Sequence, residues 1–198
     1  MDQVTKGTIG IKGSTELVVD YFYYALNSIL YQRSIIPDEL FKIENKYGLR
    51  LYALRDEGLN EYLSNVLNEV KAWCERGALK KLVLVITEYG TDKVLERWQF
   101  AILADDSTDE VKAKKTVDNI QKEIQAVLKQ VFGSVSLLPI FDTPCNFNLI
   151  VYTDKNATVP EGWGNTNAHN ITNSKSITLK SFTTSVHRVE SEITYATE

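Results

Sequence analysis

The sequence predicts an α+β domain in which three helices pack on one face of a mainly antiparallel sheet. Three segments repeat apolar residues with the 3.6-residue period of a helix. Several other segments are short apolar runs separated by turn residues, which is the pattern of strands. Helices and hairpins that follow one another in this way favour a single helical layer, with the far face of the sheet partly exposed to water.

The first helix is predicted to start near Ser14, which can cap it, and to end before Pro37. The third covers about 117–132, and Gly133 is expected to end it. The second covers about 59–74. Its apolar stripe contains Leu59, Tyr62, Leu63, Val66, Leu67, Val70, Trp73 and Cys74.

The strands alternate with these helices. Residues 47–54 are predicted to form short strands. The nearly continuous apolar run 79–87 predicts a central strand that is buried on both faces. A turn at 89–92 leads into a return strand at 94–103. The polar stretch 105–115 is expected to be a mobile loop that leads into the third helix.

Cys145–Thr153 is the next clear strand. Pro144 directly before it favours an edge position. Alternation places Phe147, Leu149 and Val151 on one face and Asn146, Asn148, Ile150 and Tyr152 on the other. An available edge can accept a peptide through main-chain hydrogen bonds.

The C-terminal segment combines two patterns. Residues 153–176 are crowded with Asn, Thr, Ser and Gly, as in a loop, and an alternating apolar pattern follows them, as in a strand. Such a segment can pair with a sheet edge or detach from it. Trp163 stands among glycines in the loop, where it either anchors the loop or meets a ligand.

Length, composition and net charge limit the classes of function that the chain can have. The 198 residues, 43% of them hydrophobic, suit one globular domain, and the net charge of −4 gives no reason to expect nucleic acid or an anionic membrane as a partner. No apolar run of about 18 residues suggests a membrane span, and residues 1–4 lack the features of a signal peptide. The two cysteines indicate a reducing compartment.

No catalytic constellation is apparent. The two histidines, His169 and His187, stand in no motif, and a pair of Cys145 with His187 is the one nucleophilic alternative. Because Cys145 lies in an apolar strand, an inert thiol is favoured. Cys74 and Cys145 do not have the spacing of metal ligands, so we expect no enzyme, no metal and no cofactor.

Four segments together resemble the HORMA-domain family, and most closely its spindle-checkpoint members. They are Asn-Ser-Ile-Leu-Tyr-Gln-Arg at 27–33, Leu-Glu-Arg-Trp-Gln-Phe at 95–100, Tyr-Thr-Asp-Lys at 152–155, and Ser-Phe-Thr-Thr to His187 at 181–187. The resemblance implies a single HORMA domain over 1–198. It has a core of about 11–153 and a C-terminal safety belt of about 154–198, here called the belt.

The resemblance also implies two native folds, open and closed. In the open fold the belt covers the edge of the strand Cys145–Thr153; in the closed fold it moves across the sheet and wraps over a peptide added there. The implied peptide-binding residues are Cys145, Asn146, Phe147, Asn148, Leu149, Ile150, Val151, Tyr152 and Thr153. The implied belt residues are Trp163, Phe182, Val186, His187, Val189, Ile193 and Tyr195.

Partners and location follow from the same resemblance. The partners are a kinetochore-anchored arrest-deficient coiled-coil protein, the cell-division-cycle activator of the anaphase-promoting complex, a budding-uninhibited-related checkpoint protein, and an AAA+ remodelling ATPase with its HORMA adaptor. Sequestering the activator would delay anaphase, and the protein would work in the nucleus, at kinetochores and in the cytoplasm. The alternative is another HORMA adaptor, such as a translesion-polymerase subunit, which would bind a different peptide by the same device.

Family members also dimerise as open–closed pairs through the third helix. Lys129 and Gln130, off the buried stripe, match an Arg-Gln pair, and Leu137 matches a nearby aromatic position. Lysine keeps the charge of arginine without its bidentate fork. The implied self-association surface therefore consists of Lys129, Gln130 and Leu137.

Overall fold

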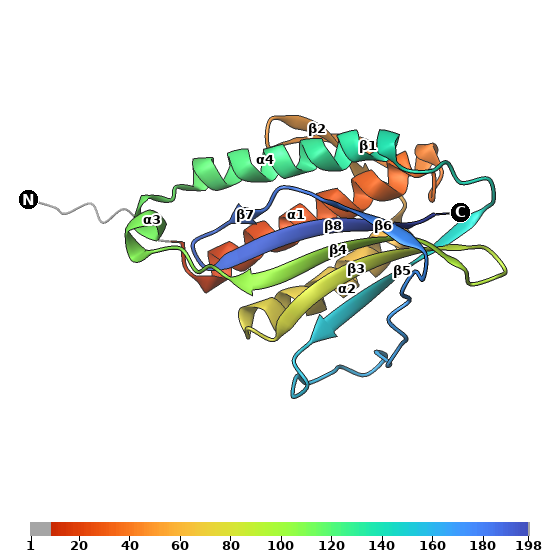
Figure 1. The fold of residues 1–198 in the computed structure, drawn as a ribbon. Helices are drawn as coiled ribbons and strands as arrows, with labels where there is room; N and C mark the ends of the chain where they lie inside the picture. The colour runs from red at the N-terminus through yellow and green to blue at the C-terminus, as the bar shows by residue number, and fades with distance from the viewer. Residues whose placement is uncertain (1–8, 198) are drawn as a thin grey trace, which may run out of the picture.

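The computed structural model describes residues 9–197 and has the predicted α+β architecture. The N-terminal residues 1–4, where a signal peptide was not expected, lie outside this range. Three long helices, α1 (Ile11–Gln32), α2 (Glu57–Glu75) and α4 (Val117–Ser134), form one layer, with α1 between the other two (Figure 1). The fold class predicted from the apolar periods is thus confirmed.

A six-stranded antiparallel sheet forms the second layer. Its path runs β5-β3-β4-β8-β6, and a short strand, β7, also pairs with β8. Its strands are β3 (Leu79–Glu88), β4 (Val94–Ala104), β5 (Cys145–Thr153), β6 (Ser174–Thr178), β7 (Phe182–Thr183) and β8 (His187–Ala196). The chain therefore ends in a strand that is inserted between β4 and β6.

The start of α1 differs from the prediction. Gly10 is the N-cap and provides no side-chain bond, while Ser14 is buried inside the first turn and bonds elsewhere. The helix ends as expected before Pro37, because Ser34 turns the chain with a φ of 53°.

The other long helices have the side-chain caps that their sequences permit. Asp56 accepts a bond from Leu59 N at 2.9 Å, and Thr116 accepts one from Asn119 N at 3.2 Å. The prediction that Gly133 ends the third helix is wrong, because α4 runs through it to Ser134 and continues into a 3-10 turn, η2 (Val135–Leu137).

Two stretches contain more structure than their sequences suggested. The polar stretch 105–115 includes a short helix, α3 (Asp109–Lys114), which is capped by Thr108 and buries no residue. Because α3 has no apolar stripe, the period gave no signal for it. Residues 47–54 hold only β2 (Leu49–Leu54); its partner β1 (Phe41–Lys46) was missed. Tyr47 and Gly48, with φ of 52° and 67°, form the turn between them.

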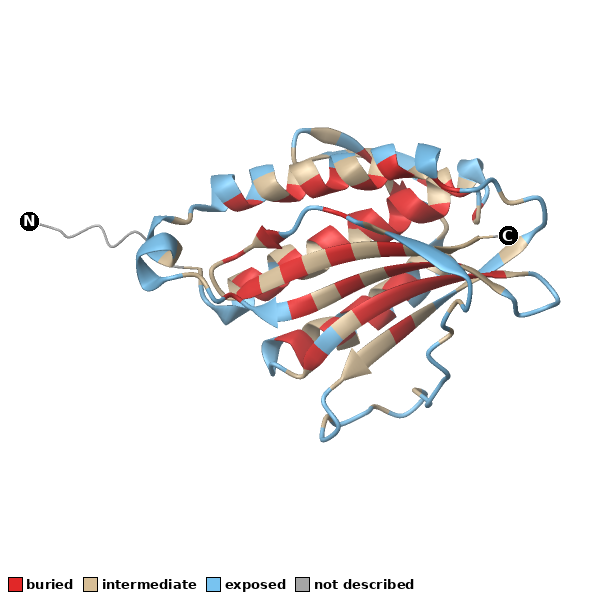
Figure 2. Cartoon of the chain, viewed as in Figure 1, coloured by how far each residue is buried: buried red, intermediate tan, exposed pale blue. Residues whose placement is uncertain are grey.

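The core lies between the helices and the sheet (Figure 2). Strand β3 is buried on both faces, as predicted, and is an interior strand between the edge strand β5 and the middle strand β4. Leu82 and Leu84 join the main core, while Val83 and Val85 belong to a small cluster on the far face. A short 3-10 turn, η1 (Asp38–Leu40), connects the α1 region to the β1–β2 hairpin.

A candidate peptide-binding edge and its belt

Strand β5 lies at one edge of the sheet. It pairs with β3 alone, from Leu79 opposite Thr153 to Glu88 opposite Cys145. Phe147, Leu149 and Val151 pack against the main core, and Ile150 and Tyr152 against the far-face cluster. The strand is thus held by its side chains and by β3, while the outer side of its backbone has no neighbouring strand among the described residues.

The belt has to span the whole sheet. It leaves β5 at one edge and enters β6 at the opposite edge, so residues 154–173 cross from one side of the molecule to the other (Figure 1). This path leaves space outside β5. The space is a groove of about 810 Å³ between α2, β5 and the belt.

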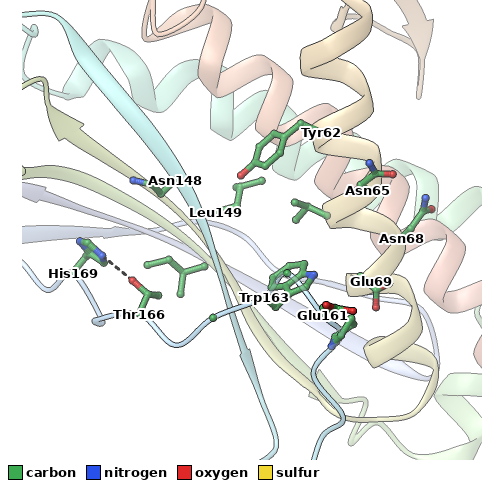
Figure 3. Close-up of a pocket in the computed structure, with 15 residues that line it drawn as sticks. Tyr62, Asn65, Asn68, Glu69, Asn148, Leu149, Glu161, Trp163, Thr166 and His169 are labelled. Carbon is green, nitrogen blue, oxygen red and sulfur yellow. Dashed lines mark hydrogen bonds between the residues drawn. The ribbon is translucent and has the colours of Figure 1, made fainter.

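Three elements line this groove (Figure 3). The belt contributes Trp163 and His169, and β5 contributes the stretch 148–150. Helix α2 presents Tyr62, Asn65, Val66, Asn68 and Glu69. A second, smaller hollow of about 240 Å³ lies beyond, between residues 149–152 of β5 and 163–168 of the belt.

The groove offers both apolar and polar contacts. Leu149, Val66 and the Trp163 indole provide apolar surface, and the asparagine side chains provide hydrogen-bond donors and acceptors. Glu69 and Glu161 are its formal charges, and no lysine or arginine is among the described residues that line it. Such a groove suits an extended peptide better than a compact polar metabolite.

The α2 side of the groove was not recognised in the sequence. Tyr62 was placed on the buried stripe, but it is 45% exposed and its ring meets that of Phe147 edge-on. Asn65, Asn68 and Glu69 resemble any solvated helix face, because the sequence pattern cannot distinguish a side that faces a groove from one that faces water.

The C-terminal half of the belt is anchored in the core. Phe182, Val189 and Ile193 are fully or almost fully buried, while Val186 and Tyr195 are half-buried. Strand β8 pairs with β4 over nine residue pairs, from Glu96 opposite Tyr195 to Ala104 opposite His187. These anchors hold β8 on the side of the sheet away from β5.

His187 is part of a buried polar cluster. Its Nδ1 lies 2.6 Å from Ser14 Oγ, which also contacts the Thr184 hydroxyl, and its Nε2 lies 3.7 Å from Cys74 Sγ. Burial lowers the pKa of His187 and raises the pKa of Cys74, so the neutral imidazole and the thiol are the favoured forms. The cluster links α1 and α2 to the start of β8.

The alternative pairing of Cys145 with His187 is excluded. Cys145 stands opposite Glu88, and His187 stands opposite Ala104, so they lie at opposite ends of the sheet. Burial also raises the pKa of the Cys145 thiol, which is unfavourable for a nucleophile. Within residues 9–197 no group of three or more His, Cys, Asp or Glu is placed to hold a metal. In that same range, no helix has both the length and the apolar character needed to cross a membrane.

The residues expected to support self-association lie near one end of α4. Lys129 is exposed, and Leu137, in the following turn, is 67% exposed. Gln130 differs from the expectation: it is half-buried, and its Oε1 accepts a bond from Lys180 N. The reason is that the belt between β6 and β7 runs alongside α4 (Figure 1).

Comparison with known proteins identifies the family to which this fold belongs. The HORMA domain profile matches residues 14–190. The chain belongs to the HORMA domain family. It is 43% identical over 192 residues to the Dictyostelium discoideum "Mitotic spindle assembly checkpoint protein MAD2A", covering 96% of this chain and 95% of that protein. The human protein of the same name is 42% identical over 189 residues, covering 94% of this chain and 92% of that protein.

Solved structures have the same fold as this chain. A chain of the "Crystal Structure of Mitotic Checkpoint Complex" superposes with a TM-score of 0.85 at 36% identity, covering 93% of this chain and 99% of that chain. Caenorhabditis elegans HTP-2, solved bound to HTP-3 closure motif 1, superposes with a TM-score of 0.81 at 14% identity, covering 100% of this chain and 95% of that chain. At that identity the likeness concerns the fold alone.

Proposed function

We propose that this HORMA protein is a spindle assembly checkpoint adaptor, not an enzyme, that captures a partner peptide by β-strand addition to β5 beneath the belt. The checkpoint assignment is supported by relatives of 42–43% identity over nearly the full length, which are named for that process. The capture mechanism is supported by one observation above all: the outer edge of β5 is free and borders a groove of about 810 Å³.

The groove favours a particular peptide chemistry. Its backbone edge accepts an extended chain, and its apolar wall at Leu149 and Trp163 accepts aliphatic side chains. Because Glu69 and Glu161 carry the formal charges of the described lining, a basic residue in the peptide is preferred over an acidic one.

The proposed adaptor switches between two arrangements. The present one, with β8 on β4 and β5 unpaired on its outer side, corresponds to the closed, peptide-receptive fold. In the open fold the C-terminal segment covers the β5 edge instead. Partners bias the equilibrium because they bind only where the edge is free.

The proposed partners are those of the checkpoint. A kinetochore-anchored arrest-deficient coiled-coil protein and the activator of the anaphase-promoting complex provide the peptides. A budding-uninhibited-related protein completes the inhibitory assembly, an AAA+ ATPase with its HORMA adaptor remodels it, and a second copy binds near Lys129 and Leu137. The sites of action are the nucleus, kinetochores and cytoplasm.

The test is a peptide in which single backbone N–H groups are methylated in turn. Strand addition predicts that sensitivity alternates along the peptide, because only every second N–H points at β5. Each sensitive position should weaken binding by roughly 2- to 12-fold, the value of one net hydrogen bond, measured by fluorescence anisotropy. Uniform or absent sensitivity would contradict strand addition.

Peptides from two different partners distinguish the checkpoint role from the role of another HORMA adaptor. A peptide from the activator of the anaphase-promoting complex and one from a translesion polymerase should be compared on the same protein. Stronger retention of the first is expected. Preference for the second would assign the chain to the other HORMA adaptor role.

A further inference from the structure

One tryptophan of α2 contacts the belt at two places. Trp73 is 2% exposed, and its indole Nε1 donates a hydrogen bond to Thr158 O at 3.0 Å. Its ring also meets the Trp163 ring edge-on, with centroids 5.0 Å apart and an interplanar angle of 85°. The sequence pattern explains Trp73 as a core residue of α2, but its position also fixes the chain that forms the groove wall.

The belt on the β5 side of this contact is fastened at further points. Asp154 N donates to Ala78 O at 2.8 Å, the Asp154 carboxylate pairs with Lys80 at 3.0 Å, and the Ala157 side chain packs against the core. Residues 154–163 are therefore held along their length, from the end of β5 to Trp163.

The belt beyond Trp163 is held differently. Within residues 9–197, no hydrogen bond joins the segment 164–172 to the rest of the molecule; the one bond it makes, Thr166 Oγ1 to His169 Nε2 at 3.3 Å, is internal. The next fastening is Asn173 O, which accepts from Thr197 N at 3.0 Å. Trp163 thus marks a boundary between two segments of the belt, 154–163 and 164–172.

A β-turn directly precedes this boundary and is closed by the bond from Trp163 N to Pro160 O at 3.3 Å. Gly162, with a φ of 91°, and Gly164 flank Trp163, and a side chain at either position would meet nothing within 4 Å. The positive φ of Gly162 is one that other residues rarely adopt. Glycine at this point therefore serves the backbone conformation and not close packing.

We propose that Trp73 is a positioning residue that clamps the belt at Thr158 and Trp163. The clamp makes residues 154–163 a fixed wall of the groove and leaves 164–172 as the part that swings to admit and release a peptide. This inference rests on the proposed peptide-capture function, because the clamp acts on the wall that the peptide would contact. A wall that is already ordered loses less entropy when the peptide binds, so loosening it should speed release.

Two variants test the clamp. Trp73→Phe keeps an aromatic ring in the core but removes the N–H that holds Thr158, and Trp163→Ala removes the partner ring while leaving Trp73 in place. Each should release a fluorescent activator peptide faster, by roughly 2- to 12-fold for the lost hydrogen bond in Trp73→Phe. Tyr23→Phe is the matched control, since it removes a 3.0 Å bond from α1 to Asn60 of α2 without touching the belt. Its release rate should stay at the wild-type value.

Hydrogen exchange separates a clamp from a merely structural residue. In Trp73→Phe the hydrogen-bonded amides of Ala157 and Trp163 should lose protection, while those of the α2 interior should keep theirs; the amides of 165–172, which donate no hydrogen bond within the described part of the chain, should exchange equally fast in both proteins. Unchanged release together with unchanged protection of 155–163 would overturn the proposal, as would a loss of protection spread evenly over α2. If the wild-type protein retains no peptide at all, the proposed capture function is wrong. The exchange pattern of the free protein then still shows whether Trp73 holds residues 154–163 in place.

Discussion

Buried polar residues lie at both ends of strand β8. At one end, Glu96 of β4 forms an ion pair with Arg33 at 2.9 Å and accepts a bond from Trp98 Nε1 at 2.5 Å. At the other end, His187 bonds to Ser14. Burial raises the pKa of Glu96, against the opposing effect of Arg33. Because leaving a buried polar group without a partner costs more than the bond itself contributes, the His187–Ser14 bond fixes the start of β8 against α1, and the Glu96–Arg33 pair fixes the strand β4 on which β8 pairs.

His187 should make stability depend on pH. The pKa of its imidazole is lowered in the folded state, so below about pH 6.5 the unfolded chain takes up a proton that the folded chain resists. Stability is complete above that pH and declines as pH falls towards the lowered pKa, by at most about 1.4 kcal/mol per pH unit. Urea unfolding between pH 7.5 and 5.5 should show this decline.

Two variants identify the group responsible. His187→Gln should flatten the pH dependence in this window, whereas Ser14→Ala, which removes the hydrogen-bond partner but keeps the titrating ring, should retain it. An equal slope in wild type and His187→Gln would show that another group titrates there.

Single elements differ in how far the sequence predicts them. Strand β5 was predicted at its observed bounds, since an apolar alternation between Pro144 and Asp154 is a local signal. Helix α3 and strand β1 were missed because neither presents a continuous apolar face: α3 buries nothing, and β1 buries Phe41 alone. The groove face of α2 was missed for another reason: its polar side chains follow the same pattern whether they face a groove or water.

In the proposed switch, strand β8 is the element on which the closed arrangement depends. Val189 and Ile193 are completely buried, and each is worth very roughly 1.5–3 kcal/mol. Deleting the chain from Val189 onward removes both, together with most of the pairing to β4. We expect a folded but open protein that does not retain the activator peptide, as measured by circular dichroism and peptide release. The control Val117→Ala, at a side chain 47% exposed, should alter neither. A truncated protein that still releases peptide slowly would contradict the belt mechanism.

At the scale of the whole molecule, the path of the belt leaves the outer edge of β5 without a neighbouring strand among the described residues. The present fold places β5 and β6 at opposite edges. Moving the C-terminal segment to the β5 edge would break nine residue pairs between β4 and β8 and expose the side chains beneath them. Two arrangements of one sequence can then coexist only if their free energies differ by a few kcal/mol, with a high barrier between them.

Purified protein should therefore separate into two monomeric species on ion exchange. We expect interconversion over minutes to hours, because the β4–β8 ladder has to open before a new pairing forms. Addition of the activator peptide should convert the mixture to one species, since a peptide that binds one arrangement shifts the population towards it. A single species both with and without peptide would argue against the switch.

The sequence by itself determined the fold class, the three long helices, the burial of β3 on both faces and the bounds of β5. These features follow from apolar periodicity, which depends on neighbouring residues and on whether each faces a core. Only the tertiary structure decided that β8 inserts between β4 and β6. Ladder hydrogen bonds are similar at either sheet edge, so a polar, strand-forming segment can pair at both, and the choice depends on contacts such as Ser14 with His187 across more than 170 residues of chain. The same holds for the groove, because α2, β5 and the belt become neighbours only when the whole chain has folded.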